Sequence, residues 1–379
     1  MDATLERPTT TLPSSSDAKP SVSESSISKP CASAHGNIAP SDADNEFRVV
    51  GAEHIITPAD LPADKRNWQE AIYAKTHALG YIVLRGFDIK DAEHFQEFLQ
   101  QELNIEPWNV FNKLKMAGPI ITLIRRITDG ILGAGDNRSY LNAQLQKLGA
   151  IENSVQGPHV EGGVYDKRAR YLFMYCEEAP SHWGETGVAD MHKVYESLST
   201  QTQQGLAQAQ QQFEFTSIKR LNWLERTILT LGKIKHYVRP DENMQMLMDT
   251  TPMVCRHPEH QIACPQIWAY RGDTVHQAAS DTFPERTPLD PECMASTWQM
   301  KWNLTDRTGQ PIEHGVAMMD ELIEATFKAC RLVRWQQGDI TVVDNIRCAH
   351  WRMNGHADQP RKVYQLQAVP FLASDYQMD

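Results

Sequence analysis

Residues 157–163, GPHVEGG, contain two side chains that could bind a metal, His159 and Glu161. In a strand, residues i and i+2 point to the same face, so this spacing would aim an imidazole and a carboxylate at one point. Such a pair can start an iron site. The spacing alone is not specific, because a chain with 14 His and 48 Asp and Glu among 379 residues forms such triplets by chance. The triplets at 257–259 and 356–358 are two others.

A further histidine, His350, lies in the segment DNIRCAHWR. Two histidines and one carboxylate leave open positions on one face of iron(II), which can hold a bidentate 2-oxoacid and dioxygen. His159, Glu161 and His350 would form this triad. A dicarboxylate co-substrate also needs its far carboxylate held, and arginine can donate two parallel hydrogen bonds to it. Arg361 lies eleven residues beyond His350, on the next predicted strand.

These residues need strands to position them, and two strand-rich blocks are predicted on either side of a long middle segment. A helix over 63–79 ends at a glycine before the strand GYIVLRGF, and Asp91 caps a second helix that continues through Leu103. Later segments with strand character are RYLFMYCEEAP (170–180), LVRW, DITVVDN and KVYQLQAV, and helices are expected from Asp190 and near 316–330. Two blocks that each carry histidine suggest a rolled antiparallel sheet, as in jelly rolls and cupins.

The sequence resembles the TauD/TfdA family of iron(II)- and 2-oxoglutarate-dependent dioxygenases, a branch of the clavaminate-synthase-like proteins, over roughly residues 47–373. Four features match in order: GYIVLRGF, the H-x-E triplet with a following core strand, G-E-T at 184–186, and W-x-x-G-D-x-x-x-x-D-N-x-x-x-x-H with an arginine eleven residues further on. The resemblance implies that iron is held by His159, Glu161 and His350, and that Thr186 and Arg361 bind 2-oxoglutarate.

The same pattern separates His159 from its rivals. Thr186 lies 27 residues after His159, the family's spacing, whereas His257 has Pro284 at that offset and His356 leaves no room for a second ligand and an arginine strand. The histidines of HPEH, residues 257–260, could form half of a zinc site, but they lack further ligands nearby, and Pro258 favours a loop.

The departures from the family pattern bear on the substrate. Glu161 replaces the usual Asp, as in the clavaminate-synthase-type branch, and Trp183 stands where the family has glycine, which predicts a change in the loop before Thr186. The family's taurine-binding arginine falls at Gln365, so taurine is a poor candidate substrate. GPHVEGG and DNIRCAHWR are most similar to the syringomycin-type amino-acid hydroxylases of natural-product pathways, which implies an amino acid or a derivative. Arg352 could hold its carboxylate from the mouth of the barrel or cap a loop.

The predicted fold is mainly β with flanking helices (α+β), on a double-stranded β-helix core of the jelly-roll or cupin kind. Residues 1–45 are rich in Ser, Thr and Pro and are predicted to be a disordered tail. Residues 46–379 are predicted to form one oxygenase domain. An insertion at about 201–330, Gln-rich and helical at first and then irregular, is predicted to form part of a helical lid. The apolar segment 116–132, MAGPIITLIRRITDGIL, suits a packed helix or a cover over a pocket.

Composition narrows the partners and the location. A net charge of −11 without a basic stripe disfavours nucleic-acid binding, and no apolar run approaches the length of a membrane span. Seven scattered cysteines without a C-x-x-C pair fit reduced thiols in the cytoplasm. The expected partner is a small-molecule substrate, with no nucleic acid and no membrane, and the sequence does not predict an oligomeric state.

The resemblance implies oxidation of an unactivated C–H bond, coupled to conversion of 2-oxoglutarate and O2 into succinate and carbon dioxide. Hydroxylation is the expected outcome, with desaturation or ring closure left open, and the presence of Glu161 argues against a halogenase. The alternatives are an iron oxygenase that needs no 2-oxoacid, a non-catalytic protein that binds 2-oxoglutarate or metal, and a hydrolytic zinc enzyme.

Overall fold

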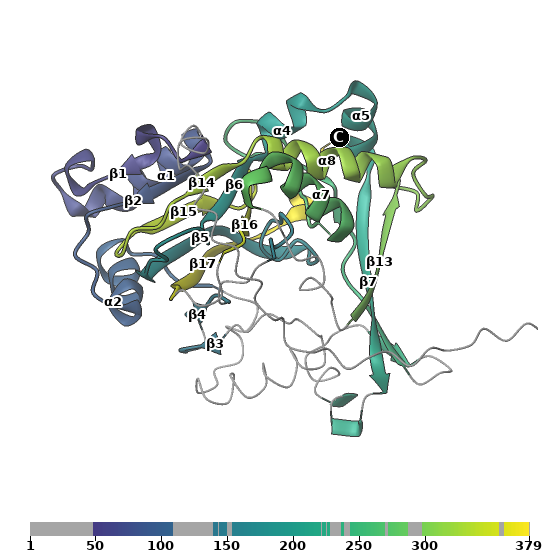
Figure 1. Cartoon of the computed structure of the whole chain (residues 1–379), viewed down its shortest axis with the longest axis horizontal. Coiled ribbons are helices and arrows are strands. Elements are labelled where there is room, and N and C mark those ends of the chain that lie inside the picture. The colour runs from purple at the N-terminus through teal and green to yellow at the C-terminus, as the bar shows by residue number, and fades with distance from the viewer. Residues whose placement is uncertain are drawn as a thin grey trace, which may run out of the picture. The chain divides into compact units, whose positions relative to one another are not determined.

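The structure is a computed structural model (Figure 1), and all of the residues that it describes belong to one compact unit, Asp42–Asp379. It describes residues 48–108, 139–142, 144–149, 154–220, 222–224, 226–227, 236–238, 243–269, 272–286, 298–355 and 360–378. The predicted tail over 1–45 and the predicted cover over 116–132 lie outside these residues.

A seven-stranded sheet forms the base of the fold. Its strands in spatial order are β1 (Ile55–Ile56), β2 (Tyr81–Leu84), β15 (Ile340–Asp344), β5 (Lys167–Glu178), β17 (Lys362–Leu372), β4 (Gln146–Lys147) and β3 (Ser139–Tyr140). Only the β1–β2 pair is parallel; the other five pairs are antiparallel. Strands from the two ends of the chain are therefore neighbours, as the sequence pattern predicted.

A three-stranded antiparallel sheet packs against one face of the larger sheet. Its order is β14 (Arg331–Val333), β6 (Thr186–Asp190) and β16 (Cys348–Arg352). Val83, Leu172 and Met174 of the large sheet share one buried cluster with Val188 and Cys348 of the small sheet. This cluster is the apolar layer between the two sheets, and side chains that alternate with outward-facing ones along each strand enter it.

Helices cover the outer faces of both sheets (Figure 1). Against the large sheet lie α1 (Trp68–Leu79) and α2 (Ala92–Glu97), the latter continued by a π-helical turn, Phe98–Glu102. Against the small sheet lie α4 (Met191–Ser197), α5 (Thr200–Gln208), α7 (Gly272–Thr282) and α8 (Gly315–Lys328). The predicted stop at Gly80, with a φ of 84°, the predicted cap Asp91 and the predicted start of a helix at Asp190 are confirmed.

The middle segment contains more strand than the sequence indicated. Beyond α5 it forms a five-stranded sheet around the long strand β7 (Gln210–Arg220). One edge of β7 pairs with β10 (Thr251–Pro252) and then with β9 (Asn243–Leu247), which in turn pairs with β8 (His236–Val238). The opposite edge of β7 pairs with β13 (Trp298–Thr305). Two short strands, β11 (Val254–Arg256) and β12 (Ala263–Pro265), form a separate hairpin. The expectation of an irregular segment was therefore wrong, because the Gln-rich run QQQFEFTS alternates polar and apolar residues with the period of a strand.

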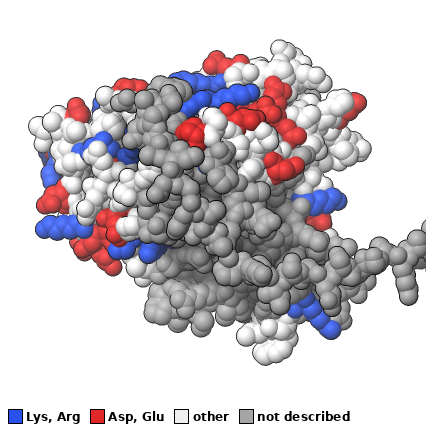
Figure 2. Space-filling view, in the orientation of Figure 1, with Lys and Arg blue, Asp and Glu red and all other residues white. Residues whose placement is uncertain are grey.

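The described surface mixes both signs of charge. Figure 2 shows Lys and Arg side chains interspersed with Asp and Glu on the described part of this face. Among the described residues, no helix is both long and apolar enough to cross a membrane. The observed architecture, mixed sheets with helices on their outer faces, agrees with the predicted α+β class.

Candidate metal centre

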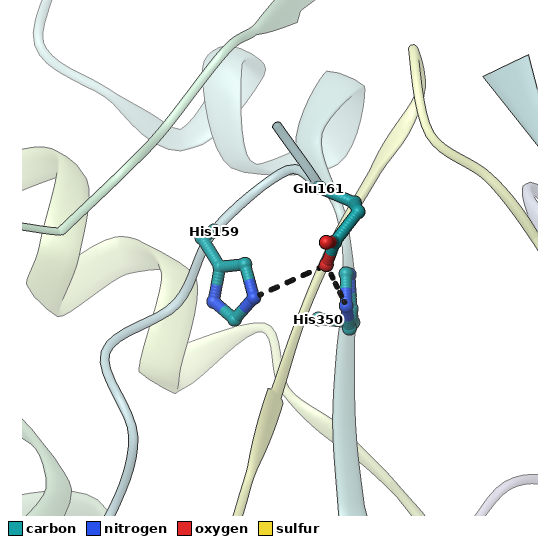
Figure 3. Close-up of side chains that lie close together, drawn as sticks. All are labelled: His159, Glu161 and His350. Carbon is teal, nitrogen blue, oxygen red and sulfur yellow. Dashed lines mark ion pairs between the residues drawn. The ribbon is translucent and has the colours of Figure 1, made fainter. Parts of the chain in front are cut away.

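His159, Glu161 and His350 come together between the two sheets and point toward one another (Figure 3). Glu161 Oε2 lies 3.8 Å from His159 Nε2 and 3.7 Å from His350 Nε2. Neighbouring ligands of a metal with bonds of about 2.1 Å lie about 3 Å apart, so small side-chain movements would suffice for coordination. Among the described residues, no other group of three or more His, Cys, Asp or Glu side chains could share a metal ion.

Backbone pairing and one hydrogen bond orient His159. His159 and His350 exchange both backbone hydrogen bonds, 3.1 and 2.9 Å long, so their side chains lie on the same side of the chain pair. The Nδ1 of His159 donates to the carbonyl of Gly157 at 2.8 Å. Because the carbonyl can only accept, Nδ1 must carry the proton, and Nε2 of the neutral ring has its lone pair free to bind a metal.

The carboxylate ligand is held by two amide side chains that the sequence analysis missed. Asn345, fully buried, accepts from the Glu161 backbone N–H at 2.7 Å and donates to the Glu161 carbonyl at 3.0 Å and the Ala169 carbonyl at 2.8 Å. Gln367 on β17 donates to Glu161 Oε1 at 3.3 Å. Asn345 belongs to the D-N motif before His350, but nothing in the sequence indicated which residue it would contact.

Thr186 begins β6 and lies on the inner face of the small sheet. In the pairing of β6 with β16, Thr186 is opposite Arg352, and Val188 is opposite His350. The indole Nε1 of Trp335 donates to Thr186 Oγ1 at 3.2 Å. Thr186, His350 and Arg352 therefore share one face, because directly opposed residues and residues two apart point the same way. The structure thus brings the predicted Thr186 and Arg352 to the same inner face as the triad.

The loop that leads to Thr186 is fixed by an arginine from the middle segment. Arg286 donates two hydrogen bonds to the carboxylate of Glu185, 2.8 and 2.9 Å long, and both side chains are buried. The guanidinium also lies 5.4 Å from the ring centre of Trp183. Trp183 has a φ of 57°, in the left-handed region that glycine favours, so the non-glycine residue keeps a glycine-like backbone there. No motif in the sequence pointed to Arg286.

Arg361 is buried, and among the described residues its Nε has no hydrogen-bond partner. One of its terminal nitrogens donates to the carbonyl of Gly149 at 3.3 Å. Burial, and to a smaller extent the positive charge of nearby Arg352, lowers the pKa of Arg361 to about 10. A guanidinium that is charged at neutral pH, buried and without a hydrogen-bonded carboxylate in the described part of the chain suits an anionic ligand.

Gln365 and Gln367 lie two apart on the same face of β17, which begins just after Arg361, and Gln365 is buried. It stands directly opposite Gln146 of β4. Among the described residues, the Nε2 atoms of both glutamines lack hydrogen-bond partners. Neutral amide donors therefore occupy the position where the family pattern has a taurine-binding arginine.

The rival histidine triplet at 257–259 is part of a different buried cluster. His257 is fully buried, and its Nε2 lies 3.0 Å from a carboxylate oxygen of Asp344. Burial alone would raise the pKa of Asp344, but hydrogen bonding to His257 and the charge of Arg170 hold it below its usual value. The arrangement is a paired core histidine, in agreement with the sequence analysis. The triplet at 356–358 lies outside the described residues.

The family comparison gives one match over most of the chain. The family described as taurine catabolism dioxygenase TauD, TfdA matches residues 37–367. No curated protein sequence matches this chain.

Solved structures are similar at low sequence identity. PvcB from Pseudomonas aeruginosa is 13% identical, with 83% of this chain and 84% of that chain covered and a TM-score of 0.48. A putative alpha-ketoglutarate-dependent taurine dioxygenase from Burkholderia xenovorans is 13% identical, with 86% and 91% covered and a TM-score of 0.49. AAD-2, solved with Mn(II) and N-oxalylglycine, is 12% identical, with 88% and 98% covered and a TM-score of 0.48.

Proposed function

The chain belongs to the taurine catabolism dioxygenase TauD, TfdA family, and from this premise we propose that it is an iron(II)- and 2-oxoglutarate-dependent oxygenase. Its reaction would oxidise an unactivated C–H bond of a small amino-acid-like substrate, in secondary metabolism. Hydroxylation is the expected outcome, and desaturation or cyclisation would follow if the pocket holds the substrate radical differently.

His159 and His350 would bind iron(II) through Nε2, and Glu161 through its carboxylate. Two histidines and one carboxylate are the donor set typical of non-haem iron(II) oxygenases. When bound, iron(II) with 2-oxoglutarate and O2 supplies the oxidant for the C–H bond, with succinate and carbon dioxide as the co-products. Asn345 and Gln367 would keep the Glu161 carboxylate aimed at the metal.

Arg361 and Thr186 would bind the far carboxylate of 2-oxoglutarate. The observation that carries the proposal is the buried guanidinium of Arg361, which has no hydrogen-bonded carboxylate among the described residues and lies close enough to Arg352 for the two charges to interact. A buried charge of this kind is costly unless an opposite charge joins it. A dicarboxylate that reaches from the triad to Arg361 would provide that charge.

The finer features of the enzyme are part of this proposal. The two facing sheets would form a double-stranded β-helix core, and the segment 201–330 would form part of its lid. Arg352, on the face that carries Thr186 and His350, would hold a carboxylate of the substrate. Gln365 in place of an arginine argues against taurine, and the subgroup of syringomycin-type amino-acid hydroxylases fits best.

A reducing cytoplasm fits the thiols. Five cysteines among the described residues are buried and form no disulfide: Cys176, Cys255, Cys264, Cys330 and Cys348. Burial raises the pKa of Cys176, Cys255 and Cys330 to about 12, which keeps these thiols protonated and unreactive.

The test is succinate release from 2-oxoglutarate in air, without added substrate, by protein loaded with iron(II) or with zinc. We expect slow succinate formation with iron only, and loss of it in His159→Ala and Glu161→Ala. Activity with zinc and not with iron would instead favour a hydrolase. No succinate from the iron-loaded protein, together with 2-oxoglutarate binding, would leave a non-catalytic binding protein.

A further inference from the structure

The GPHVEGG segment, residues 157–163, lies between two extended segments and is paired with both. Only one of these two segments supplies a residue of the triad. On one side is β16 with His350; on the other are residues 267–269 of the middle segment. Val160 donates its N–H to the carbonyl of Ile267 at 2.9 Å, and Ala269 donates to the carbonyl of Pro158 at 2.9 Å. These two hydrogen bonds join the residues on either side of His159 and Trp268. His159 and Trp268 are therefore a directly opposed, non-hydrogen-bonded pair of an antiparallel ladder.

Opposed residues of a non-hydrogen-bonded pair have the closest side chains in an antiparallel ladder, with Cα atoms about 4.5 Å apart, and they point to the same face. The Trp268 side chain therefore leaves the backbone on the same side as the imidazole of His159. His350, His159 and Trp268 form one cross-strand row. The backbone pairing thus places the Trp268 side chain next to that of a triad residue. Trp268 comes from the middle segment and not from either strand-rich block.

The glycines of the motif make this close approach possible. A Cβ at Gly157 would lie 3.0 Å from the carbonyl oxygen of Ala269, and a Cβ at Gly163 would lie 3.3 Å from the Cβ of Trp268. Both distances are tighter than ordinary contacts. Larger side chains at these positions would push the Trp268 segment away from His159.

The indole of Trp268 is held by an apolar wall and is itself partly exposed. The rings of Phe213 and Phe215 on β7 meet it edge to face, with ring centres 5.0 and 6.1 Å away. On the adjacent β9, Met246 is paired with Phe215, and Met246 is fully buried. These contacts fix the orientation of the indole, whose partly exposed ring is the aromatic surface available to a ligand.

We propose that Trp268 forms one wall of the substrate site and that the substrate presents a flat, aromatic or conjugated group to it. This inference rests on the proposed function and adds the substrate class to it. A flat ring stacks or packs edge-on against an indole better than a saturated ring of the same size. Trp268 is thus a specificity-determining residue, located next to the first metal ligand by backbone pairing.

The experiment uses matched probes on the whole protein, loaded anaerobically with iron(II) and 2-oxoglutarate. The probes are L-phenylalanine against L-cyclohexylalanine, and benzamide against cyclohexanecarboxamide, with L-lysine as a cationic probe. Binding is followed by the change of the weak visible absorption band that a 2-oxoacid gives when it chelates iron(II). The variants are Trp268→Phe, Trp268→Leu and, as a control, Trp223→Leu, which removes an indole that is 76% exposed.

We expect the flat member of each pair to bind the wild type and Trp223→Leu about threefold to tenfold more tightly than its saturated analogue. Trp268→Phe should keep most of this preference, and Trp268→Leu should bring the ratio close to one. Equal binding of flat and saturated probes by the wild type would overturn the inference, as would an unchanged ratio in Trp268→Leu. Tightest binding of L-lysine would show that the indole receives a cation instead. Absence of the band in the wild type would instead contradict the proposed function itself.

Discussion

The imidazole of His159 is prepared to bind a metal because its Nδ1 proton is donated to the carbonyl of Gly157. That hydrogen bond selects the tautomer with the proton on Nδ1, so the unprotonated Nε2, which faces Glu161, can bind the metal. The chemistry of this residue therefore depends on the backbone of its own segment, two residues away. This explains why a His-x-Glu triplet in another context, such as His257 paired with Asp344, has a structural role.

Arg361 gives the clearest prediction for a single residue. Arg361→Met removes a buried charge, so the free energy of unfolding of the unliganded protein should stay the same or rise by up to about 1 kcal/mol. The affinity for 2-oxoglutarate should fall by about tenfold or more, because charge-assisted hydrogen bonds are lost. Urea unfolding and an anaerobic 2-oxoglutarate titration measure the two effects.

The exposed Arg334 provides the control for this substitution. Arg334→Met removes the same charge from the surface and should change neither stability nor affinity appreciably. A large loss of stability in Arg361→Met with unchanged 2-oxoglutarate affinity would assign Arg361 a purely structural role.

The residues that follow a motif could be predicted, and those that depend on register could not. His159, His350 and Thr186 stand at fixed spacings in the sequence, and the structure brings them to one interior face. Gln367 and Trp268 have no such spacing. Their positions follow from strand pairings between segments far apart in the chain, which one sequence does not specify.

At the scale of elements, the loop before β6 depends on a residue from the middle segment. In Arg286→Met, the buried Glu185 would lose its partner, which should lower the free energy of unfolding by about 3 to 5 kcal/mol. The KM for 2-oxoglutarate should rise more than kcat falls, because the loop leads directly to Thr186. Chemical unfolding and succinate kinetics in air measure these effects.

A double variant separates stability from positioning. Glu185→Gln combined with Arg286→Met leaves no buried unpaired charge, so much of the lost stability should return. The raised KM should persist, since nothing then fixes the loop. If KM returned together with stability, the pair would contribute only to folding.

Asn345 links the turn after β15 to the backbone of Glu161. Asn345→Ala removes three buried hydrogen bonds, which should cost about 2 to 4 kcal/mol of stability. It should also weaken iron(II) binding by about tenfold to a hundredfold, the usual effect of residues that orient metal ligands. Anaerobic iron titration measures the affinity.

A second buried asparagine serves as the matched control. Asn354 donates to the carbonyl of Arg286 at 3.1 Å and is not hydrogen-bonded to a triad residue in any described contact. Asn354→Ala should lose stability while keeping its iron affinity. Equal iron affinity in both variants would refute the positioning role of Asn345.

Elements with a strong apolar pattern were predicted well. The strand over 80–87 contains β2, and the helix near 316–330 is α8, Gly315–Lys328. The strands of the middle segment were missed, because β7 begins with three glutamines, and their partners in β9 and β13 are distant in sequence. Cross-strand packing of Phe213 and Phe215 stabilises these strands, and local propensity does not reveal it.

On the scale of the whole molecule, the triad joins two segments that are almost 200 residues apart in sequence. A metal that binds both should stabilise the folded state, since the unfolded chain has no such site. At a free iron(II) concentration 100 times the dissociation constant, the gain should be about 2.7 kcal/mol, or roughly 4 °C in Tm for a domain of this size. Thermal unfolding under argon tests this, with His350→Ala as the variant that should show little shift.

The arrangement of the main strands could be predicted from the sequence, but the individual pairings within the middle segment could not. The two strand-rich blocks do form neighbouring strands, as β5 between β15 and β17 shows. The pairing of Trp268 with His159 could not be foreseen, because the middle segment read as irregular and so provided no register. The part of the site that the family shares was thus accessible from sequence, and the part specific to this chain was not.

The most direct test of the central claim is an anaerobic optical titration of the iron(II)-loaded protein with 2-oxoglutarate. The account predicts a weak visible band for the wild type, no band for His350→Ala, and a band for Arg361→Met only at much higher 2-oxoglutarate concentration. If the wild type binds iron(II) but no band appears at any 2-oxoglutarate concentration, the assignment of this chain as a 2-oxoglutarate-dependent oxygenase is wrong.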